Sequence, residues 1–326
     1  MASSTETAAQ IEAWFDDHGL PYFTGDHADR VEGWLSSKRI VAALLLIVAA
    51  AVGAGVLVGV VLADRGSLGT AVGVLVFLAL LGLFAGRLLR MGTMLRWAIR
   101  RTFGSLGLMF PLLTRALPLL LLAVTFLFIN AEVWQVAALM SRPVLWVSVL
   151  FFGVIAMVFL LVRLPEEVRE VERDVVGDRV AECCVGTPAE QAAHGASPEP
   201  ADLPRFARAN LVLVLLFNQA IQVLLLALGL FAFFAVFGSL TIPDSTVEAW
   251  TGAGVTDLPS LGRIIPLTNE LFQVSVFLSA FSGLYFTVYA VTDGTYRSQF
   301  FAGVSHELER AVAVNAVYVS LSRDEP

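Results

Sequence analysis

The sequence is short of charge, of lysine and of cysteine, and the shortage of charge already narrows the class of protein. Only 15% of its 326 residues are charged, against about 25% in a soluble domain, and 57% are hydrophobic. A soluble globular protein is therefore a poor interpretation, and the composition indicates a membrane protein. Lysine occurs once against twenty arginines, and alanine, valine and glycine are abundant, which is typical of a GC-rich bacterial genome.

Motifs that carry common catalytic chemistry are also missing. The sequence contains no Walker-type phosphate loop, no GxSxG elbow, no HExxH pair and no dinucleotide-binding fingerprint. The four histidines have no partners at ligand spacing, so we interpret them as surface residues. Cys183 and Cys184 lack the further ligands that a metal site needs, and we expect free thiols in a reducing compartment. We therefore expect no enzyme, no cofactor, no metal and no nucleic-acid partner.

Six long uncharged runs dominate the sequence instead. A hydrocarbon core of about 30 Å takes about 20 helical residues, and every run reaches that length. The runs, of which the third contains a single acid, are 40–63, 66–86, 116–140, 143–162, 209–237 and 271–292. They are too uniformly apolar for the alternating strands of a barrel. The sequence predicts an all-α polytopic membrane protein with six transmembrane helices in three hairpins, accompanied by cytosolic amphipathic helices.

The basic residues fall mostly on one side of this topology. If the segment before residue 39 is cytosolic, eighteen of the twenty-one Lys and Arg residues are cytosolic, and only Arg65, Arg142 and Arg263 lie outside. This positive-inside bias predicts a plasma-membrane protein with both termini in the cytosol. The first run is not expected to be a secretory signal, because a 38-residue, acid-rich tail precedes it.

The segments around the spans have distinct compositions. The chain divides into a cytosolic tail (1–38), spans 1 to 4 (39–164), a cytosolic charged helix with a flexible linker (165–208), spans 5 and 6 (209–292) with an external loop (238–270), and a cytosolic amphipathic tail (293–326). We predict a short helix in the first tail, ended by Gly19 and Pro21. Pro165 is expected to begin the charged helix, and 185–204 has linker composition. A short external helix with an Asp or Ser cap is predicted over 243–250.

Three fragments resemble known sequences. They are HGLPYF at 18–23, FINAEVWQ at 128–135 and ELER at 307–310. Together they resemble pieces of uncharacterised actinobacterial multi-spanning integral membrane proteins. The resemblance implies a plasma-membrane location, and it carries no activity that transfers to this chain.

The segment 87–115 is the most basic part of an acidic protein, with six arginines and no acidic residue. Helical spacing gathers five of the arginines on one half of a helix and apolar residues on the other. The five are Arg87, Arg90, Arg96, Arg100 and Arg101, opposite Leu88, Met91, Leu95, Ala98, Ile99 and Phe103. We predict that this helix lies on the inner leaflet, where anionic headgroups attract each basic residue by about 1 kcal/mol. A purely topogenic role is an equal alternative.

Polar residues inside the runs are the first candidates for function, because they are costly in lipid. We select Asn130 and Glu132 in the third run and Asn218 and Gln222 in the fifth. Glu132 is interpreted as neutral, as paired with Arg142, or as a titrating gate in a hydrated cavity. Asn218 and Gln222 share a helix face, where they either bond to another helix or line a pathway.

Two further patterns concern the last two runs. The fifth run stays uncharged from residue 209 to 243, so we expect tilt, or unwinding near Gly238, to absorb its excess length. In the sixth, Ser275, Ser279 and Gly283 recur every four residues, which predicts a packing stripe.

Two functions from different classes remain open. The first is a membrane scaffold, assembly or regulatory subunit, in which the basic helix and the cytosolic segments bind lipid headgroups, a protein partner or a second copy. The alternative is a small-solute or ion permease or channel, with a polar site between spans 3, 5 and 6.

Overall fold

A computed structural model gives the fold for most of the chain. It describes residues 4–23, 45–50, 52–54, 56, 76–77, 80, 83–84, 86–87, 91–104, 124–195, 203–256, 267–292 and 294–323. The regular secondary structure of these residues is helical, and they contain no β-strand, which confirms the all-α prediction. Most of the two expected spans 40–63 and 66–86, the first part of 116–140, and Arg90 lie outside the described residues.

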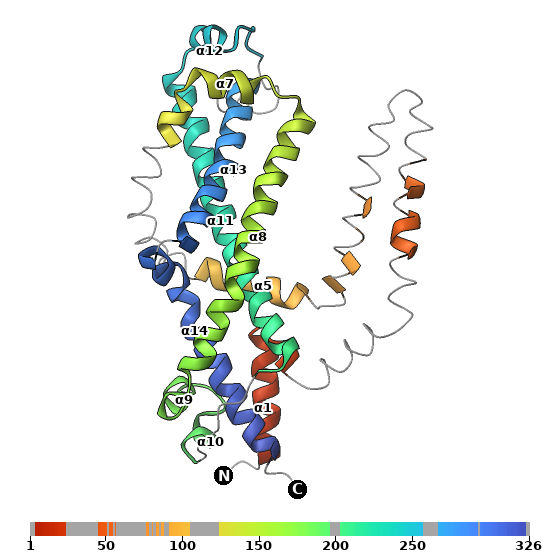
Figure 1. Cartoon of the computed structure of the whole chain (residues 1–326), viewed down its shortest axis with the longest axis vertical. Coiled ribbons are helices and arrows are strands. Elements are labelled where there is room, and N and C mark those ends of the chain that lie inside the picture. The colour runs from red at the N-terminus through yellow and green to blue at the C-terminus, as the bar shows by residue number, and fades with distance from the viewer. Residues whose placement is uncertain are drawn as a thin grey trace. The chain divides into compact units, whose positions relative to one another are not determined.

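Figure 1 labels the described helices in chain order. They are α1 (Ser4–Asp17), the short 3-10 helix η1 (Pro21–Phe23), α5 (Met91–Gly104), α7 (Ala131–Ala138), α8 (Arg142–Asp174), α9 (Asp178–Cys183), α10 (Glu190–Gly195), α11 (Arg205–Thr241), α12 (Asp244–Thr251), α13 (Asn269–Thr292) and α14 (Gly294–Arg323). The chain forms two compact units. Unit 1 comprises Met1–Ala98, Val175–Val214 and Ala311–Pro326, and unit 2 comprises Ile99–Asp174 and Leu215–Arg310.

Within the described residues, three helices are long and apolar enough to cross a membrane: α8, α11 and residues Asn269–Ala290 of α13. The 33 residues of α8 span about 50 Å at 1.5 Å per residue. This helix continues through Pro165, so the expectation that Pro165 begins a separate helix is wrong. Proline removes only one hydrogen bond from a helix interior, and the surrounding turns are sufficient to continue it. Likewise, α11 stays helical through Gly238 to Thr241, so it does not unwind there.

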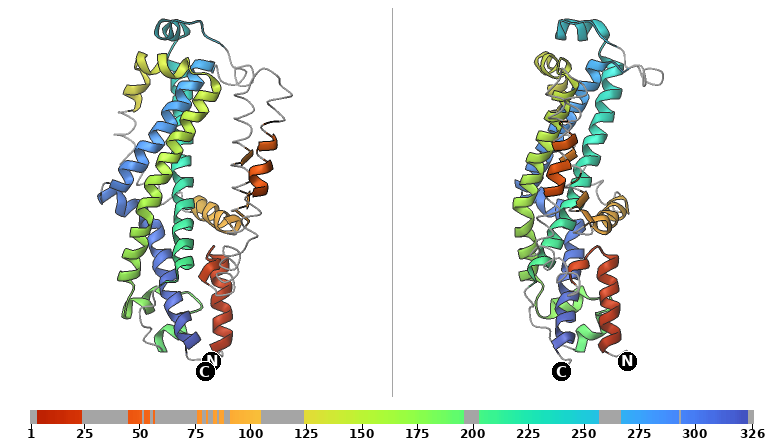
Figure 2. Two further views of the ribbon diagram at one scale, coloured as in Figure 1. Left: turned by 45° about the vertical axis from the view of Figure 1, so that its right-hand side comes forward. Right: turned by 90° about the vertical axis from the view of Figure 1, so that its right-hand side faces the viewer.

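In unit 2, α8, α13 and residues 215–241 of α11 run side by side, with α7 and α12 at one end (Figures 1 and 2). We call this end the α7 end. An aromatic core fills it: the ring of Phe128 stacks on Phe234 at 4.8 Å, and Trp134 lies 5.6 Å from Trp250. A Cβ atom at Gly238 would collide with the side chains of Leu271 and Phe128. Glycine at this position therefore lets these two side chains pack directly on the α11 backbone, and a larger residue would displace them.

The third apolar run is broken rather than continuous. Residues 124–128 are helical, the helix stops at Ile129, and α7 begins at Ala131. Asn130 is extended and its side chain accepts a hydrogen bond from the Glu132 amide at 2.8 Å, which caps the new helix. The expectation of one helix through 116–140 is therefore corrected: α7 is a separate helix across the α7 end.

Unit 1 packs the two ends of the chain together. Asn210 is fully buried, accepts from the Tyr22 amide at 3.1 Å and donates to the Gly19 carbonyl at 3.0 Å. Gly19 has φ +73°, a conformation that favours glycine, and it ends α1 as the sequence predicts. Tyr318 of α14 donates to the Glu12 carboxylate at 2.6 Å and meets the Phe15 ring edge-on.

Two shorter segments differ from expectation in detail. Part of the stretch expected as a linker over 185–204 is helical: α10 covers Glu190–Gly195. Before it, Thr187 Oγ1 accepts from the Ala189 amide at 3.2 Å and Glu190 accepts from the Gly186 amide at 2.9 Å. The T-x-x-E spacing of Thr187 and Glu190 was the signal for it. The short helix expected over 243–250 is present as α12, but the residue before it is Pro243, which provides no side-chain cap.

Candidate functional site

The four polar residues selected from the sequence lie at two separate levels of unit 2. Asn130 and Glu132 lie at the α7 end, where Asn130 caps α7 and Glu132 is exposed in its first turn. Asn218 and Gln222 are buried on α11, 1% and 7% exposed. Phe128, two residues before Asn130, stacks on Phe234, which is 16 residues or about 24 Å along α11 from Asn218. The structure does not bring the four residues together.

One further residue belongs with the amides of α11. Gln219 is 0% exposed, and among the described residues neither its amide oxygen nor its amide nitrogen has a hydrogen-bond partner. We refer to Asn218, Gln219 and Gln222 as the α11 amides. The sequence shows that the three amides lie within two helical turns. It does not show that Gln219 is buried by other residues of the chain.

Unlike Gln219, the amide side chains at the α7 end form hydrogen bonds within the described structure. The guanidinium of Arg142 donates to Asn269 Oδ1 and lies 4.6 Å from the centre of the Phe272 ring. Gln273 donates to the Met140 carbonyl at 2.8 Å and accepts from Asn269 at 3.4 Å. We call Arg142, Asn269 and Gln273 the outer clamp. It joins the start of α8 to the start of α13.

The outer clamp also argues against one of the three interpretations of Glu132, its ion pair with Arg142. The sequence allowed an ion pair between Glu132 and Arg142, whereas the structure pairs Arg142 with Asn269. Sequence analysis missed Asn269 and Gln273 because both lie at the edge of an apolar run rather than inside it. Their spacing of four residues, which places them on one helix face, was the available signal.

A second contact fixes the loop before α13. Glu270, 7% exposed, accepts hydrogen bonds from the Thr256 amide at 3.1 Å and from the Thr256 hydroxyl at 2.7 Å. The carboxylate is thus a structural acceptor that joins the start of α13 to Thr256, which follows α12.

The small polar residues of α13 mostly bond to their own helix. The hydroxyls of Ser279, Ser282 and Thr287 donate to carbonyls four residues earlier, at 2.6, 2.6 and 2.8 Å. A Cβ at Gly283 would lie 3.4 Å from Val223 and 3.7 Å from Ala227 of α11. Gly283 therefore packs closely on a neighbouring helix, as the stripe predicts. Ser275 is buried and, in the described part of the chain, its hydroxyl has no partner.

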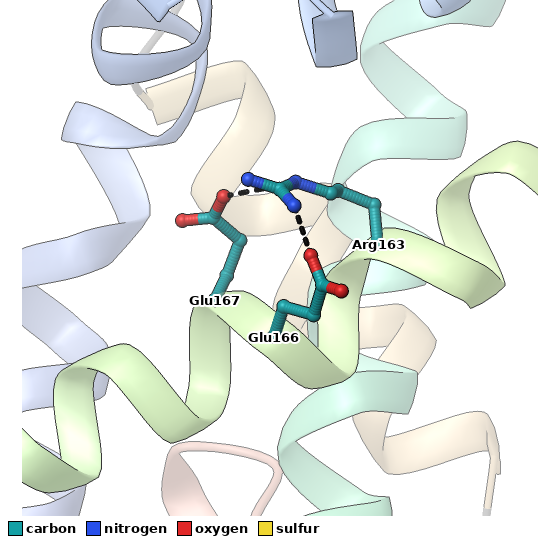
Figure 3. A network of polar contacts seen from close by, with 3 residues as sticks. All are labelled: Arg163, Glu166 and Glu167. Atoms are coloured by element: carbon teal, nitrogen blue, oxygen red, sulfur yellow. Dashed lines mark hydrogen bonds and ion pairs between the residues drawn. The ribbon is translucent and has the colours of Figure 1, made fainter.

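Charged residues gather where α8 leaves its apolar part. Arg163 forms ion pairs with Glu166 and, at 3.6 Å, with Glu167 (Figure 3). Burial raises the pKa of the Glu167 carboxyl; Arg163 lowers this pKa, while Glu170 and Glu166 raise it further. The sequence shows the mixed charges of this segment but not that Glu167 is the buried one.

The basic helix α5 exposes a face different from the one expected. Met94 and Ala98 are fully buried, whereas Leu95 and Ile99, predicted with Ala98 on the apolar half, are each 40% exposed. Arg96 and Arg100 are exposed beside them, and Arg87 is exposed before the helix. Arg101 lies in α5, and its side chain is outside what the structure describes.

Metal-binding chemistry finds no support in the described residues. No group of three or more His, Cys, Asp and Glu side chains there is placed to hold a metal ion. Cys183 and Cys184 form no disulfide in the described structure, and both are buried. Burial in α9 and the following turn explains their place in the chain as packing residues.

Comparisons with known proteins give no relative: no family model matches the chain, and neither a curated protein nor a solved structure is significantly similar to it. The resemblance to actinobacterial membrane proteins stays a prediction.

Proposed function

We propose that the chain is a plasma-membrane protein that crosses the bilayer six times, with both termini in the cytosol, and acts as a scaffold, assembly or regulatory subunit. Three apolar helices of spanning length support the membrane location. We infer that unit 1 provides the surface that binds a partner, because it packs residues from both ends of the chain into one compact unit. The buried Asn210, which ties residues 19–22 to the start of α11, is the observation that carries the proposal.

Contacts in unit 1 support an even number of crossings. Residues 19–22 bond to Asn210, so both lie on one side of the membrane, and the chain between them crosses an even number of times. Because α8 is one crossing, an odd number must precede it, and three are expected from residues 40–140. The contact of Glu12 with Tyr318 likewise requires an even number after Asn210, which α11 and α13 supply.

The use of polar groups also favours a scaffold over a transporter. Asn130 is a helix cap, and the outer clamp and Glu270 join helices and loops. Exposed apolar side chains on α8, among them Val147, Leu150 and Val154, suit contact with lipid tails. Most polar residues near the spans thus stabilise the fold.

Topology is tested by two exposed positions. Single cysteines replace Ala13 of α1 or Ala249 of α12 in a chain whose Cys183 and Cys184 are changed to alanine. A membrane-impermeant thiol reagent applied to intact cells is expected to label position 249 and to reach position 13 only after the membrane is opened. Labelling of both positions in intact cells would contradict the proposed topology.

The scaffold role is tested by photocrosslinking in living cells. A photoreactive amino acid at the exposed positions Ala9 or Ala13 is expected to give one discrete protein adduct. Val147 and Val154 are matched controls, since they are exposed on the apolar surface of α8 and are expected to give lipid adducts only. An absence of protein adducts from unit 1, together with solute flux through the purified protein, would overturn the scaffold role.

A permease is the second candidate, and Gln219 is the observation that favours it. A buried primary amide without a partner costs about 1–3 kcal/mol, and a polar solute or ion would supply the missing bonds. Single cysteines at positions 218, 219 and 222, each treated with an impermeant reagent from either side, test for a hydrated pathway. If the reagent labels none of them, the permease loses its site.

A further inference from the structure

The helix α5 has two faces with different environments. Its buried face consists of Met94 and Ala98, with Trp97 half-buried beside them. This face meets the turn that ends α1: a Cβ added at Gly19 would lie 3.3 Å from Met94 Cα and 3.3 Å from Trp97 Cβ. The first part of α5 is therefore held in unit 1 by its own contacts, and the opposite face is left uncovered.

The uncovered face mixes large aliphatic and cationic side chains. Leu95 and Ile99 are each 40% exposed, although they are four residues apart on one stripe. Arg96 and Arg100, the residues that follow them, are also exposed and four residues apart. Two parallel stripes result, one apolar and one basic, along the same side of the helix.

The apolar stripe is unfavourable in water, and the basic stripe is unfavourable in a protein core. An aliphatic stripe bordered by arginines is the arrangement of helices that lie in the headgroup region, with their apolar side chains at the acyl boundary and their cations at the phosphates. The surroundings add charge complementarity, because the segment 87–115 carries six arginines and no acid in a chain of net charge −7. Arg87, exposed one turn before α5, adds to the same positive field.

We propose that Leu95, Arg96, Ile99 and Arg100 form a docking surface for the anionic phospholipids of the inner leaflet. The inner-leaflet assignment rests on the proposed topology, whereas the preference for anionic lipid does not. The sequence alone left a purely topogenic role equally open. Exposure of Leu95 and Ile99 favours docking, because topogenic charge requires no apolar stripe beside it.

The experiment measures how well water reaches position 99 in a defined bilayer. Ile99→Cys, in the chain without Cys183 and Cys184, carries a fluorophore and is reconstituted in vesicles of phosphatidylcholine alone or with phosphatidylglycerol in both leaflets. Acrylamide, a neutral quencher, reports exposure. We expect quenching at position 99 to fall several-fold when phosphatidylglycerol is present, because the field of Arg96 and Arg100 draws the stripe to the lipid.

Matched variants separate charge from folding. Adding Arg96→Gln and Arg100→Gln is expected to return quenching to the value in phosphatidylcholine, and Arg96→Lys with Arg100→Lys is expected to preserve the protection. Ala13→Cys on α1 is the control position, with equal quenching in both lipids. Equal quenching of position 99 in both lipids, whether high or low, would overturn the proposal. Since both leaflets hold phosphatidylglycerol, a wrong topology cannot produce that result.

Discussion

The outer clamp and the α11 amides are two polar groups in the same helical unit, and they differ in their partners. In the outer clamp, Asn269 accepts from Arg142 and Gln273 donates to the Met140 carbonyl. On α11, by contrast, Gln219 is fully buried and both ends of its amide lack a partner in the described structure. The amide of a glutamine is therefore hydrogen-bonded in one region, whereas in the other region that of Gln219 has no partner among the described residues.

This difference limits what a polar residue in an apolar run indicates. Asn130 looked like an intramembrane candidate, and it is a helix cap. Gln273 looked unremarkable in sequence, and it joins α13 to the turn between α7 and α8. A polar residue is a functional candidate when it is buried and its own fold leaves it without a partner, and Gln219 meets that condition in the part of the chain that the structure describes.

The largest expected effect is steric and lies at the α7 end. Gly238→Val adds a side chain where even a Cβ would collide with Leu271 and Phe128. We expect the free energy of unfolding in mixed micelles to fall by about 3 kcal/mol, the upper part of the range for overpacked cores. Gly229→Val on the same helix is the control, since no atom lies within 4 Å of a Cβ there. Equal losses for the two variants would show that the α7 end is not closely packed.

A smaller loss is expected when the outer clamp is opened. Asn269→Leu removes the acceptor of Arg142 and leaves only its contact with Phe272. The free energy of unfolding should fall by about 1–2 kcal/mol, as for a hydrogen bond to a charged group. Asn269→Asp keeps an acceptor beside the guanidinium but loses the donor to Gln273, so it should lose less stability than Asn269→Leu. If Asn269→Leu has no effect, the clamp does not hold α8 to α13.

The smallest expected effect is a pH dependence at Glu167, beyond the proposed crossing segment 143–162. Burial raises the pKa of this carboxyl in the folded chain. The folded state therefore binds more protons than the unfolded state between the ordinary glutamate pKa and the raised one. Across that window the free energy of unfolding falls as pH rises, and the loss is complete above the raised pKa.

Glu167→Gln should remove this pH dependence, since glutamine does not titrate. Unfolding at a series of pH values from about 4 upward measures it. Glu166→Gln is the matched control, because Glu166 pairs with the same arginine from an exposed position. If the pH dependence of the free energy of unfolding persists in Glu167→Gln and disappears in Glu166→Gln, then Glu166 is the titrating carboxyl and the prediction is wrong.

Local signals in the sequence were sufficient for several elements. Gly19 and Pro21 end the first helix as predicted, because their backbone preferences act without help from distant residues. The apolar lengths of α8, α11 and α13 follow from composition in the same way. The sequence did not reveal the break at Asn130, since an amide that caps a helix and an amide inside one occur in equally apolar surroundings.

Contacts between segments far apart in the chain could not be predicted from the sequence. The pairing of Arg142 with Asn269 joins residues 127 positions apart, and that of Asn210 with Gly19 joins residues 191 apart. The buried face of α5 is another example: periodicity placed Leu95 with Ala98, whereas packing against Gly19 buries Met94 instead. Which face a helix buries depends on its neighbour, and one sequence does not name the neighbour.

The central claim is that Gln273 stabilises the fold through its hydrogen bond, whereas Gln219 has no stabilising partner. Replacing each of these two buried glutamines tests it most directly. Gln219→Met and Gln273→Met replace each amide by an apolar side chain of similar length, and unfolding in mixed micelles compares their stabilities. Gln273→Met should lose about 0.6–2 kcal/mol, since it leaves the Met140 carbonyl without its donor. Gln219→Met should unfold no earlier than the unaltered chain, and later by up to about 1 kcal/mol. A loss for Gln219→Met as large as that for Gln273→Met would contradict the claim, because Gln219 would then hold a partner that stabilises the fold.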